Sequence, residues 1–182
     1  MNFIKTHIEG VFIIEPRIFE DSRGYFFESF NQKEFHDNIR PIHFVQDNES
    51  KSSYGVLRGL HFQKGEFAQS KLARVVKGCV YDVVVDVRKN SSTFGKYIGV
   101  ELSEDNHRMI FIPKGFAHGF SVLSEEAIFL YKVDNFYNKE SEIGIAWNDP
   151  DLNIDWHLPY ECIKVLEKDN HFPLLKDIFD LY

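Results

Sequence analysis

The segment GVLRGLHFQ (Gly55–Gln63) places two chemically capable groups inside a pattern that otherwise favours a buried strand. Arg58 is a permanent cation, and His61 is a base whose ordinary pKa lies near neutrality, so together they could bind an anion and move a proton. Side chains of a regular strand alternate between its faces, which would separate the two residues. A kink at Gly59 would let both face one cavity, and otherwise Arg58 is a surface residue beside an edge strand.

A second segment, IPKGFAHGF (112–120), carries another histidine among glycines. Its spacing P-x-G-x-x-H resembles the second sequence motif of cupin barrels, with Pro113, Gly115 and His118 at the three fixed positions. The first cupin motif is G-x5-H-x-H followed by a glutamate and a glycine, and it is resembled by Gly55, His61 and Gly78. We therefore expect His61 and His118 to face one cavity.

Two positions of the first motif depart from the pattern that binds a metal. Gln63 stands where the second histidine would be, and Lys71 falls at the position of the glutamate. A carboxamide is a poor substitute for imidazole, and a cation opposes a divalent metal, so we predict no metal and no cofactor. Lys71 could instead stabilise a developing oxyanion, the alternative being a surface lysine at the start of a strand.

Two further groups could complete a proton-transfer site. Tyr131 lies in an apolar stretch, FLYKV, where most tyrosines are core residues with a satisfied hydroxyl, but a phenol across a barrel from His61 could donate a proton. The triplet Glu167–Asp169 offers a carboxylate that could orient His61 and stabilise its imidazolium. Such charged triplets are more often solvated surface.

The elements that position these residues are predicted to be mainly strands. The 18 Phe and 8 Tyr favour a β-rich core. Strands are predicted in 10–30, broken by a turn at Asp21–Gly24, and in 97–124 and 127–137. Residues 71–89 are predicted to form a hairpin that turns at Lys77–Gly78. Many short strands predict one all-β domain over residues 1–182, a cupin-type antiparallel β-barrel or jelly roll with a few short peripheral helices.

Helices and loops are predicted at three places. Residues 31–38 are expected to form a short helix with Asn31 as N-cap and Glu34 at the capping-box position. The polar stretch that follows Phe44 is predicted to run from a strand into a loop. Pro173 could open a final short helix.

Composition excludes several classes of protein. The net charge is -7 without a basic block, so nucleic-acid binding is not expected. The two cysteines, Cys79 and Cys162, are far apart, which disfavours a disulfide framework and a thiolate metal site. No apolar run approaches the ~18 residues of a membrane span. We expect a soluble cytoplasmic protein without a membrane association.

The sequence resembles the dTDP-4-dehydrorhamnose 3,5-epimerase family of the cupin superfamily over nearly its whole length. The pair GVLRGLHFQ and IPKGFAHGF is highly specific for it. Other matching segments are FEDSRGYFFESF, FVQDNES, KLARVVKGCVYDVVVDVRKNSSTFGKY, LYKVDNFY and IAWNDPDLNIDW. Two positions depart from the common family pattern, since His157 replaces a proline after Trp156 and no proline follows Tyr137. They leave the sugar or nucleotide preference open.

The resemblance implies roles for the site residues. His61 would be the base, oriented by Asp169, Tyr131 the acid, and Lys71 the group that stabilises the enolate oxygen. The expected substrate contacts are Arg58 and His118 in the pocket, Arg23 and Lys168 near the diphosphate, Phe26 and Tyr137 at the thymine, and Gln46, Asp47, Asn48, Glu28 and Glu142. A homodimer with swapped N-terminal strands is implied, so that Arg23, Phe26 and Glu28 would serve the neighbouring subunit.

The implied reaction inverts C3 and C5 of dTDP-4-dehydro-6-deoxy-D-glucose, a dTDP-linked 4-keto-6-deoxy sugar, to give dTDP-4-dehydro-L-rhamnose. An epimerase that acts at only C3 or only C5 of another nucleotide-linked 4-keto deoxysugar is the main alternative. A metal-dependent cupin isomerase or dioxygenase and a non-catalytic sugar-nucleotide binding module are the others.

Overall fold

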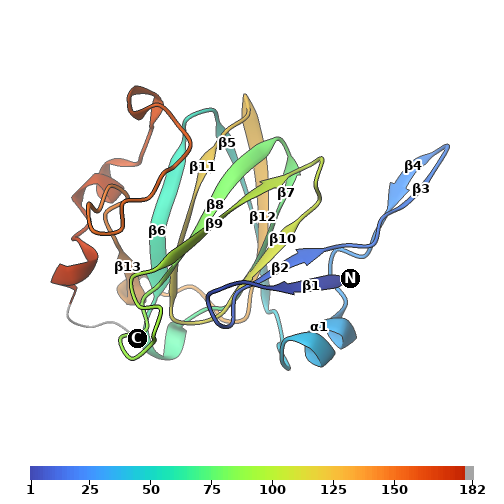
Figure 1. The fold of residues 1–182 in the computed structure, drawn as a ribbon, viewed down its shortest axis with the longest axis horizontal. Helices are drawn as coiled ribbons and strands as arrows, with labels where there is room; N and C mark the ends of the chain where they lie inside the picture. Colours follow the sequence, from blue (N-terminus) through green and yellow to red (C-terminus); the bar gives the residue numbers. More distant parts are fainter. Residues whose placement is uncertain (179–182) are drawn as a thin grey trace.

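Two antiparallel sheets form the body of the protein in the computed structural model, which describes residues 1–178 (Figure 1). The first sheet has the strand order β1 (Asn2–Lys5), β2 (Phe12–Glu15), β10 (Met109–Ile112), β7 (Lys71–Lys77), β12 (Glu126–Val133) and β5 (Gln46–Ser53). The second has the order β13 (Glu142–Gly144), β6 (Leu57–Gln63), β11 (Phe116–Val122), β8 (Cys79–Asp86) and β9 (Tyr97–Ser103). The predicted all-β jelly roll is confirmed.

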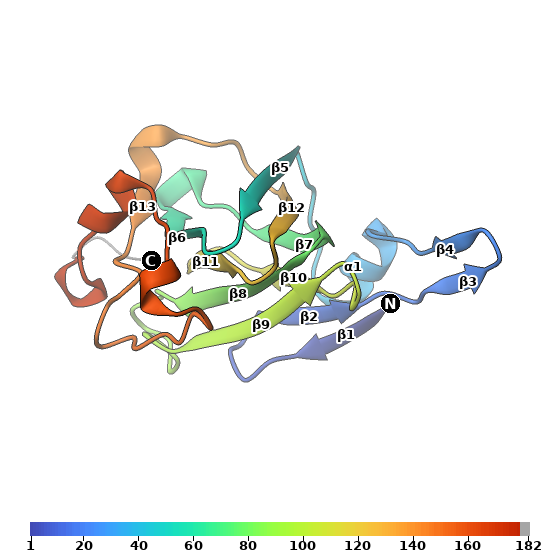
Figure 2. The same cartoon turned by 90° about the horizontal axis from the view of Figure 1, so that it is seen from above.

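The remaining elements are short and lie around the sheets. A separate hairpin, β3 (Phe19–Asp21) and β4 (Gly24–Phe26), extends away from the body in both views (Figures 1 and 2). The one α-helix in the described part is α1 (Gln32–Asn38). Single 3₁₀ segments are η1 (Gly65–Phe67), η2 (Lys139–Ser141), η3 (Tyr160–Cys162), η4 (Glu167–His171) and η5 (Leu175–Asp177).

The central strands of both sheets are covered on two faces, which explains their nearly continuous apolar sequences. Along β8, Val80 and Val84 point into a cluster between the sheets, whereas Val83 and Val85 pack outward against Trp147 and other C-terminal residues. On the outer face of the first sheet, Phe35 of α1 packs in a third cluster with residues of β2, β7 and β10. Strands buried on both faces lose the apolar–polar alternation that marks a solvent-facing sheet.

The predicted hairpin over 71–89 is wrong, although both of its strands exist. β7 pairs with β10 and β12, and β8 pairs with β11 and β9, so the two strands belong to different sheets. Gly78 does make a turn, with φ +76°, where a Cβ would collide with the carbonyl of Glu126. A turn signal shows that the chain changes direction, but the partner of each strand is set by long-range packing.

The predicted polar loop after Phe44 is also wrong, because residues 46–53 form the edge strand β5. It pairs with β12 along its whole length, from Gln46↔Val133 to Ser53↔Glu126. One of its faces lines the space between the sheets and the other meets solvent. Because both surroundings accept polar groups, the strand carries no apolar alternation that a sequence pattern could detect.

The local predictions for the helix cap and for the turn between β3 and β4 hold. Asn31 caps α1, its side chain accepting hydrogen bonds from the backbone N–H groups of Lys33 and Glu34. The predicted capping box is incomplete, since the Glu34 carboxylate pairs with the N-terminal ammonium group. The turn at Asp21–Gly24 joins β3 to β4. After Pro173 the structure has only the 3₁₀ turn η5, and residues 179–182 of the predicted final helix lie outside the described part.

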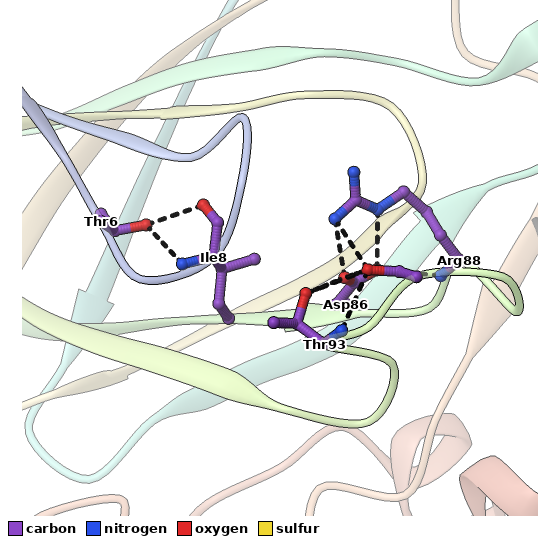
Figure 3. A network of polar contacts seen from close by, with 6 residues as sticks. Thr6, Ile8, Asp86, Arg88 and Thr93 are labelled. Carbon is purple, nitrogen blue, oxygen red and sulfur yellow. Dashed lines mark hydrogen bonds and ion pairs between the residues drawn. The ribbon is translucent and has the colours of Figure 1, made fainter.

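The loop that joins β8 to β9 is fastened by Asp86, whose side chain has no exposed surface. Figure 3 shows Arg88 and Thr93 converging on this carboxylate, at 2.7 Å and 2.6 Å from Oδ2. Ser91 donates to the same oxygen at 2.6 Å. Burial alone would raise the pKa of Asp86, but these hydrogen bonds outweigh it and lower the pKa to about 2. The carboxylate is therefore charged at neutral pH and holds the loop.

No helix within residues 1–178 combines the length and the apolar character needed to cross a lipid bilayer.

Candidate active site

A cavity of about 500 Å³ opens between the two sheets and is closed on one side by the segment 164–169. Its polar lining residues include four cations, which are Arg58, Lys71, Lys164 and Lys168. The protein as a whole carries a net charge of -7, so this concentration of positive charge is local. A cavity of this size and charge suits an anionic small molecule.

A bulge in β6 brings Arg58 and His61 to the same cavity. His118 of β11 pairs with His61 of β6, and Phe120 of β11 pairs with Arg58 of β6. Three residue steps along β6 therefore match two along β11. The additional residue reverses the alternation of side chains beyond it. Arg58 and His61 therefore both line the cavity, and Leu57 and Leu60 both pack outward. The kink expected from the sequence at Gly59 is present.

Gly59 permits this bulge because it has no side chain. Its φ is +131°, and a Cβ there would lie 2.5 Å from the Cα of Gly119 on β11. A Cβ on Gly119 would in turn lie 2.8 Å from the carbonyl oxygen of Arg58. The two strands can approach this closely only with glycine at both positions.

His61 is paired with the carboxylate of Asp169. Nε2 of His61 lies 3.1 Å from Oδ1 of Asp169, which belongs to η4, 108 residues further along the chain. The Asp169 side chain is 3% exposed, whereas that of His61 is 25% exposed toward the cavity. A carboxylate that accepts the N–H of an imidazole fixes its tautomer and leaves the lone pair on the other ring nitrogen. Here that nitrogen is Nδ1.

The opposite wall of the cavity carries Tyr131 and Lys71. Tyr131 comes from β12 and Lys71 from β7, both in the first sheet, whereas His61 is on the second sheet. The Lys71 ammonium lies 6.0 Å from the centre of the Tyr131 ring. Burial raises the pKa of Tyr131, so its hydroxyl keeps its proton at neutral pH. Burial lowers the pKa of Lys71 to about 8, with Asp82 and Glu142 acting in the other direction.

Asp82 is a member of this cluster that the sequence reasoning missed. It is fully buried on β8, and its Oδ2 lies 2.8 Å from Nε2 of His118. Its Oδ1 is buried without a hydrogen-bond partner among the described residues. Burial lowers the pKa of His118 and outweighs the nearby Asp82, which acts to raise it. The imidazole is therefore neutral at neutral pH. An aspartate inside a valine-rich strand was the available signal.

Gln63 is turned away from the cavity by its own hydrogen bonds. Its Nε2 donates to the carbonyl oxygens of Phe67 and Phe136, and its Oε1 accepts from the backbone N–H of Asn138. The side chain thus fastens a loop to β6. Within residues 1–178, no three His, Cys, Asp or Glu side chains are grouped so as to hold a metal ion.

Apart from Arg58 and His118, the predicted binding residues in the body of the protein lie around Glu142 or on β5. Lys168 and Tyr137 both contact Glu142, at 3.0 Å and 3.5 Å from Oε2, and this cluster joins the cavity through Lys168. On β5, Gln46 and Asn48 pair with Val133 and Tyr131 of β12 and share the inward face. Asp47 has the opposite orientation and forms an ion pair with Lys132 at 2.8 Å.

Three further predicted residues lie on or beside the extended hairpin, outside this cavity. Arg23 is at the tip of the extended hairpin, where its side chain is 88% exposed and pairs with Asp21. Phe26 is 66% exposed on β4, and Glu28 accepts a hydrogen bond from Asn31. The hairpin extends away from the sheets in both views (Figures 1 and 2), so one chain does not bring these residues to His61.

Lys164 also lines the cavity and was not predicted. Its backbone N–H donates to the carbonyl of Gly55, and its own carbonyl accepts from Leu57, so the segment is tied to the start of β6. The Lys164 ammonium donates to the carbonyl oxygen of Tyr54 at 3.1 Å. A lysine in an irregular C-terminal segment gives no local signal that it borders a cavity.

Comparisons with known proteins point to one family of enzymes. Residues 5–177 match the family model described as dTDP-4-dehydrorhamnose 3,5-epimerase. The Escherichia coli K12 protein of that name is 59% identical over 157 residues, which are 86% of this chain and 85% of that protein.

Two solved structures are close in fold. The dTDP-4-dehydrorhamnose 3,5-epimerase of Elizabethkingia anophelis has a TM-score of 0.94 at 55% identity, covering 97% of each chain. The dTDP-6-deoxy-D-glucose-3,5-epimerase of Legionella pneumophila, in complex with dTDP-4-keto-L-rhamnose, has a TM-score of 0.93 at 48% identity, covering 97% of this chain and 94% of that one. By its sequence and its fold, the chain belongs to the dTDP-4-dehydrorhamnose 3,5-epimerase family of isomerases.

Proposed function

We propose that this protein inverts C3 and C5 of dTDP-4-dehydro-6-deoxy-D-glucose to give dTDP-4-dehydro-L-rhamnose, by proton transfers between His61, the sugar and Tyr131. The observation that carries the proposal is the His61–Asp169 pair facing Tyr131 and Lys71 across one cationic cavity. A relative with this fold was solved with dTDP-4-keto-L-rhamnose, which supports a dTDP-linked sugar as the substrate.

The first step is removal of a proton from carbon. The C4 ketone of the sugar acidifies the hydrogens on C3 and C5. Neutral His61 takes one of them on Nδ1, and the electron pair of the broken C–H bond moves into the carbonyl to form an enolate. Asp169 stabilises the imidazolium that results, since its charge lies 3.1 Å from Nε2.

The second requirement is to hold the enolate charge on O4. Lys71 supplies a fixed ammonium on the wall of the cavity, and Asp82 keeps it charged near neutral pH by opposing its desolvation. His118 lines the same cavity as a neutral imidazole whose Nε2–H donates to Asp82, which leaves Nδ1 as a hydrogen-bond acceptor. Groups that are already oriented before the charge develops lower the barrier more than water does.

The final step returns a proton to the opposite face of the same carbon. Tyr131 and His61 stand on different sheets, so a sugar bound between them meets the base on one face and the phenol on the other. Tyr131 protonates the carbanion, and the phenolate and imidazolium then exchange their proton through solvent. Repetition at the second carbon gives the doubly inverted sugar without any net redox change.

The remaining contacts belong to the nucleotide end. We assign Arg58 and Lys168 to the diphosphate, Tyr137 and Glu142 to the mouth of the cavity, and Gln46 and Asn48 to the inner wall. Arg23, Phe26 and Glu28 would reach a cavity only in a homodimer, with the hairpin of one subunit against the neighbour. Asp47 faces away from the cavity of its own chain.

The test is turnover of dTDP-4-dehydro-6-deoxy-D-glucose in heavy water, followed by proton NMR. We expect deuterium at both C3 and C5 of the product, with no loss of rate after treatment with EDTA. Exchange at a single carbon would identify an epimerase that acts at only C3 or only C5. A requirement for added metal would overturn the proton-transfer mechanism.

A variant separates catalysis from binding. His61→Asn should abolish exchange at both carbons, because an amide cannot accept the proton, while dTDP still binds with a Kd within a few-fold of wild type. If His61→Asn exchanges deuterium at the normal rate, His61 is not the base.

A further inference from the structure

The C-terminal segment that supplies Asp169 also presses an aromatic ring against His61. The rings of Phe172 and His61 lie 5.4 Å apart between centres and are inclined at 87°, an edge-to-face arrangement. Phe172 follows directly after η4, three residues beyond Asp169. One short segment therefore reaches the imidazole with two different contacts, a carboxylate at Nε2 and a phenyl ring at the side.

Gly144 makes the place for this ring. It is the partner of His61 in the pairing of β13 with β6, and residues directly opposite in an antiparallel pair have side chains on the same face. A side chain at position 144 would therefore be the cross-strand neighbour of His61. A Cβ built there would overlap three atoms of the Phe172 ring. The phenyl ring thus occupies the volume that a side chain of β13 would otherwise fill.

The segment around Phe172 is fixed to the sheet on the other side as well. The backbone N–H of Ala146, just after β13, donates to the carbonyl oxygen of Pro173 at 2.9 Å. Nε1 of Trp147 lies 3.4 Å from Oδ1 of Asn170. The ring therefore has little freedom to move away from the imidazole.

We infer that Phe172, seated over Gly144, is a positioning residue that holds the His61 imidazole in the plane and tautomer required for proton abstraction. Asp169 alone fixes one nitrogen but leaves the ring free to pivot about that hydrogen bond. The phenyl edge contact limits this pivot and keeps Nδ1 directed into the cavity. The inference rests on the proposed role of His61 as the base, and it adds two residues to which neither the sequence motifs nor the comparisons assign a role.

The kinetic test uses two variants and a control. Phe172→Ala should lower kcat about 10- to 100-fold, the effect expected of a small misplacement of a reacting group, with KM within about twofold. Phe172→Leu keeps an apolar side chain and should recover part of the loss. Phe94→Ala removes an exposed phenylalanine from the loop between β8 and β9, outside the cavity, and should leave kcat unchanged.

A double variant tests whether Gly144 and Phe172 act through one contact. Gly144→Ala should lower kcat in the wild-type background, because its methyl group displaces the Phe172 ring. In the Phe172→Ala background the same substitution should cost much less, since the volume is then vacant. Additive losses in the double variant would mean that the two positions do not act through one contact, and would overturn the inference.

A spectroscopic measurement separates this inference from the proposed function. In ¹⁵N-labelled protein without substrate, the His61 nitrogens should report one tautomer with the proton on Nε2, and Phe172→Ala should report a mixture. This readout needs no turnover, so it stands even if the wild type fails to exchange C3 and C5 protons. Unchanged His61 signals together with a wild-type kcat in Phe172→Ala would sink the positioning role, and thermal unfolding of each variant verifies that it is folded.

Discussion

At the scale of single residues, the two cavity histidines differ because their carboxylate partners differ in surroundings. His61 meets Asp169 at the edge of the cavity and remains open to a ligand, whereas His118 meets Asp82 in the fully buried interior. Burial lowers the pKa of His118 and disfavours its charged form. His61 is instead 25% exposed and lines the cavity, where a ligand can reach its ring. The same pair of residue types thus suits a base in one place and a neutral lining group in the other.

Lys71 gives the first prediction, a loss of activity in mild alkali. Its pKa of about 8 means that the ammonium is present below that pH and lost above it, so kcat should fall as pH rises through about 8. Tyr131 does not explain such a fall, because burial raises its pKa above the ordinary value of 10. The measurement is kcat between pH 6 and 10.

The free energy of unfolding should change in the opposite direction to kcat as Lys71 loses its proton. The pKa of Lys71 is lower in the folded than in the unfolded chain, so between about 8 and 10.5 the unfolded state binds more protons, and this residue's contribution to stability rises with pH. The Lys71→Arg variant keeps its positive charge over this pH range. Its kcat should be lower than that of the wild type but should not fall as pH rises through about 8. If kcat of Lys71→Arg falls with pH just as in the wild type, another group causes the fall.

At the scale of elements, β6 shows how a strand can present two functional residues three positions apart. The bulge depends on Gly59 and Gly119, whose backbones touch. Sequence reasoning located the kink from the glycine but not its partner on β11, because that partner lies 60 residues away. The polar strand β5 was missed for a related reason, since its inward side chains face a cavity rather than a core.

The second prediction is that Gly59→Ala damages both stability and activity. The new Cβ would lie 2.5 Å from the Cα of Gly119 at a φ of +131°, so the backbone must shift. We expect a loss of about 1–3 kcal/mol in the free energy of unfolding and a larger loss of kcat than of KM. Gly65→Ala is the matched control, since Gly65 also has positive φ but open space around its Cβ position. Equal effects at the two glycines would contradict the close-approach argument.

The third prediction concerns the loop held by Asp86. The pKa of this carboxyl is lowered to about 2, so its contribution to stability is complete above its unfolded value near 3.9 and is lost as pH falls toward 2. The contribution is on the order of 2 kcal/mol. Asp86→Asn should unfold more easily at pH 7 and lose less further stability between pH 4 and 3. Urea titrations at pH 7, 4 and 3 measure both effects, and parallel acid curves for the two proteins would contradict the assignment.

At the scale of the whole molecule, the proposed substrate contacts are divided between two distant places. The cavity residues come together within one chain, whereas the hairpin with Arg23 and Phe26 extends from its far side (Figure 1). Exposed aromatic side chains on such an extension are typical of a surface that another protein covers. A homodimer would cover it and supply the missing contacts.

The fourth prediction is complementation between two inactive variants. In a dimer with shared sites, His61→Asn and the pair Arg23→Glu with Phe26→Ala should each be inactive alone. Half of the dimers formed by random mixing after co-refolding are mixed, and one of their two sites is intact, so about a quarter of wild-type activity should return. Light scattering should give twice 21.4 kDa for the wild type. A monomer, or no recovery in verified mixed dimers, would contradict the shared site.

The sequence by itself determined the class of fold, the identity of the family and the residues from which proton chemistry is proposed. Those conclusions depend on local features, such as the fixed spacing around His61 and His118, the turn glycines and the replacement of a metal ligand by Gln63. Only the tertiary structure decided that β7 and β8 enter different sheets, that Asp82 sits behind His118, and that Phe172 fills the space above Gly144. Each of these is a contact between segments far apart in the chain, whose partners are selected by packing of both sheet faces and leave no periodic trace in the sequence.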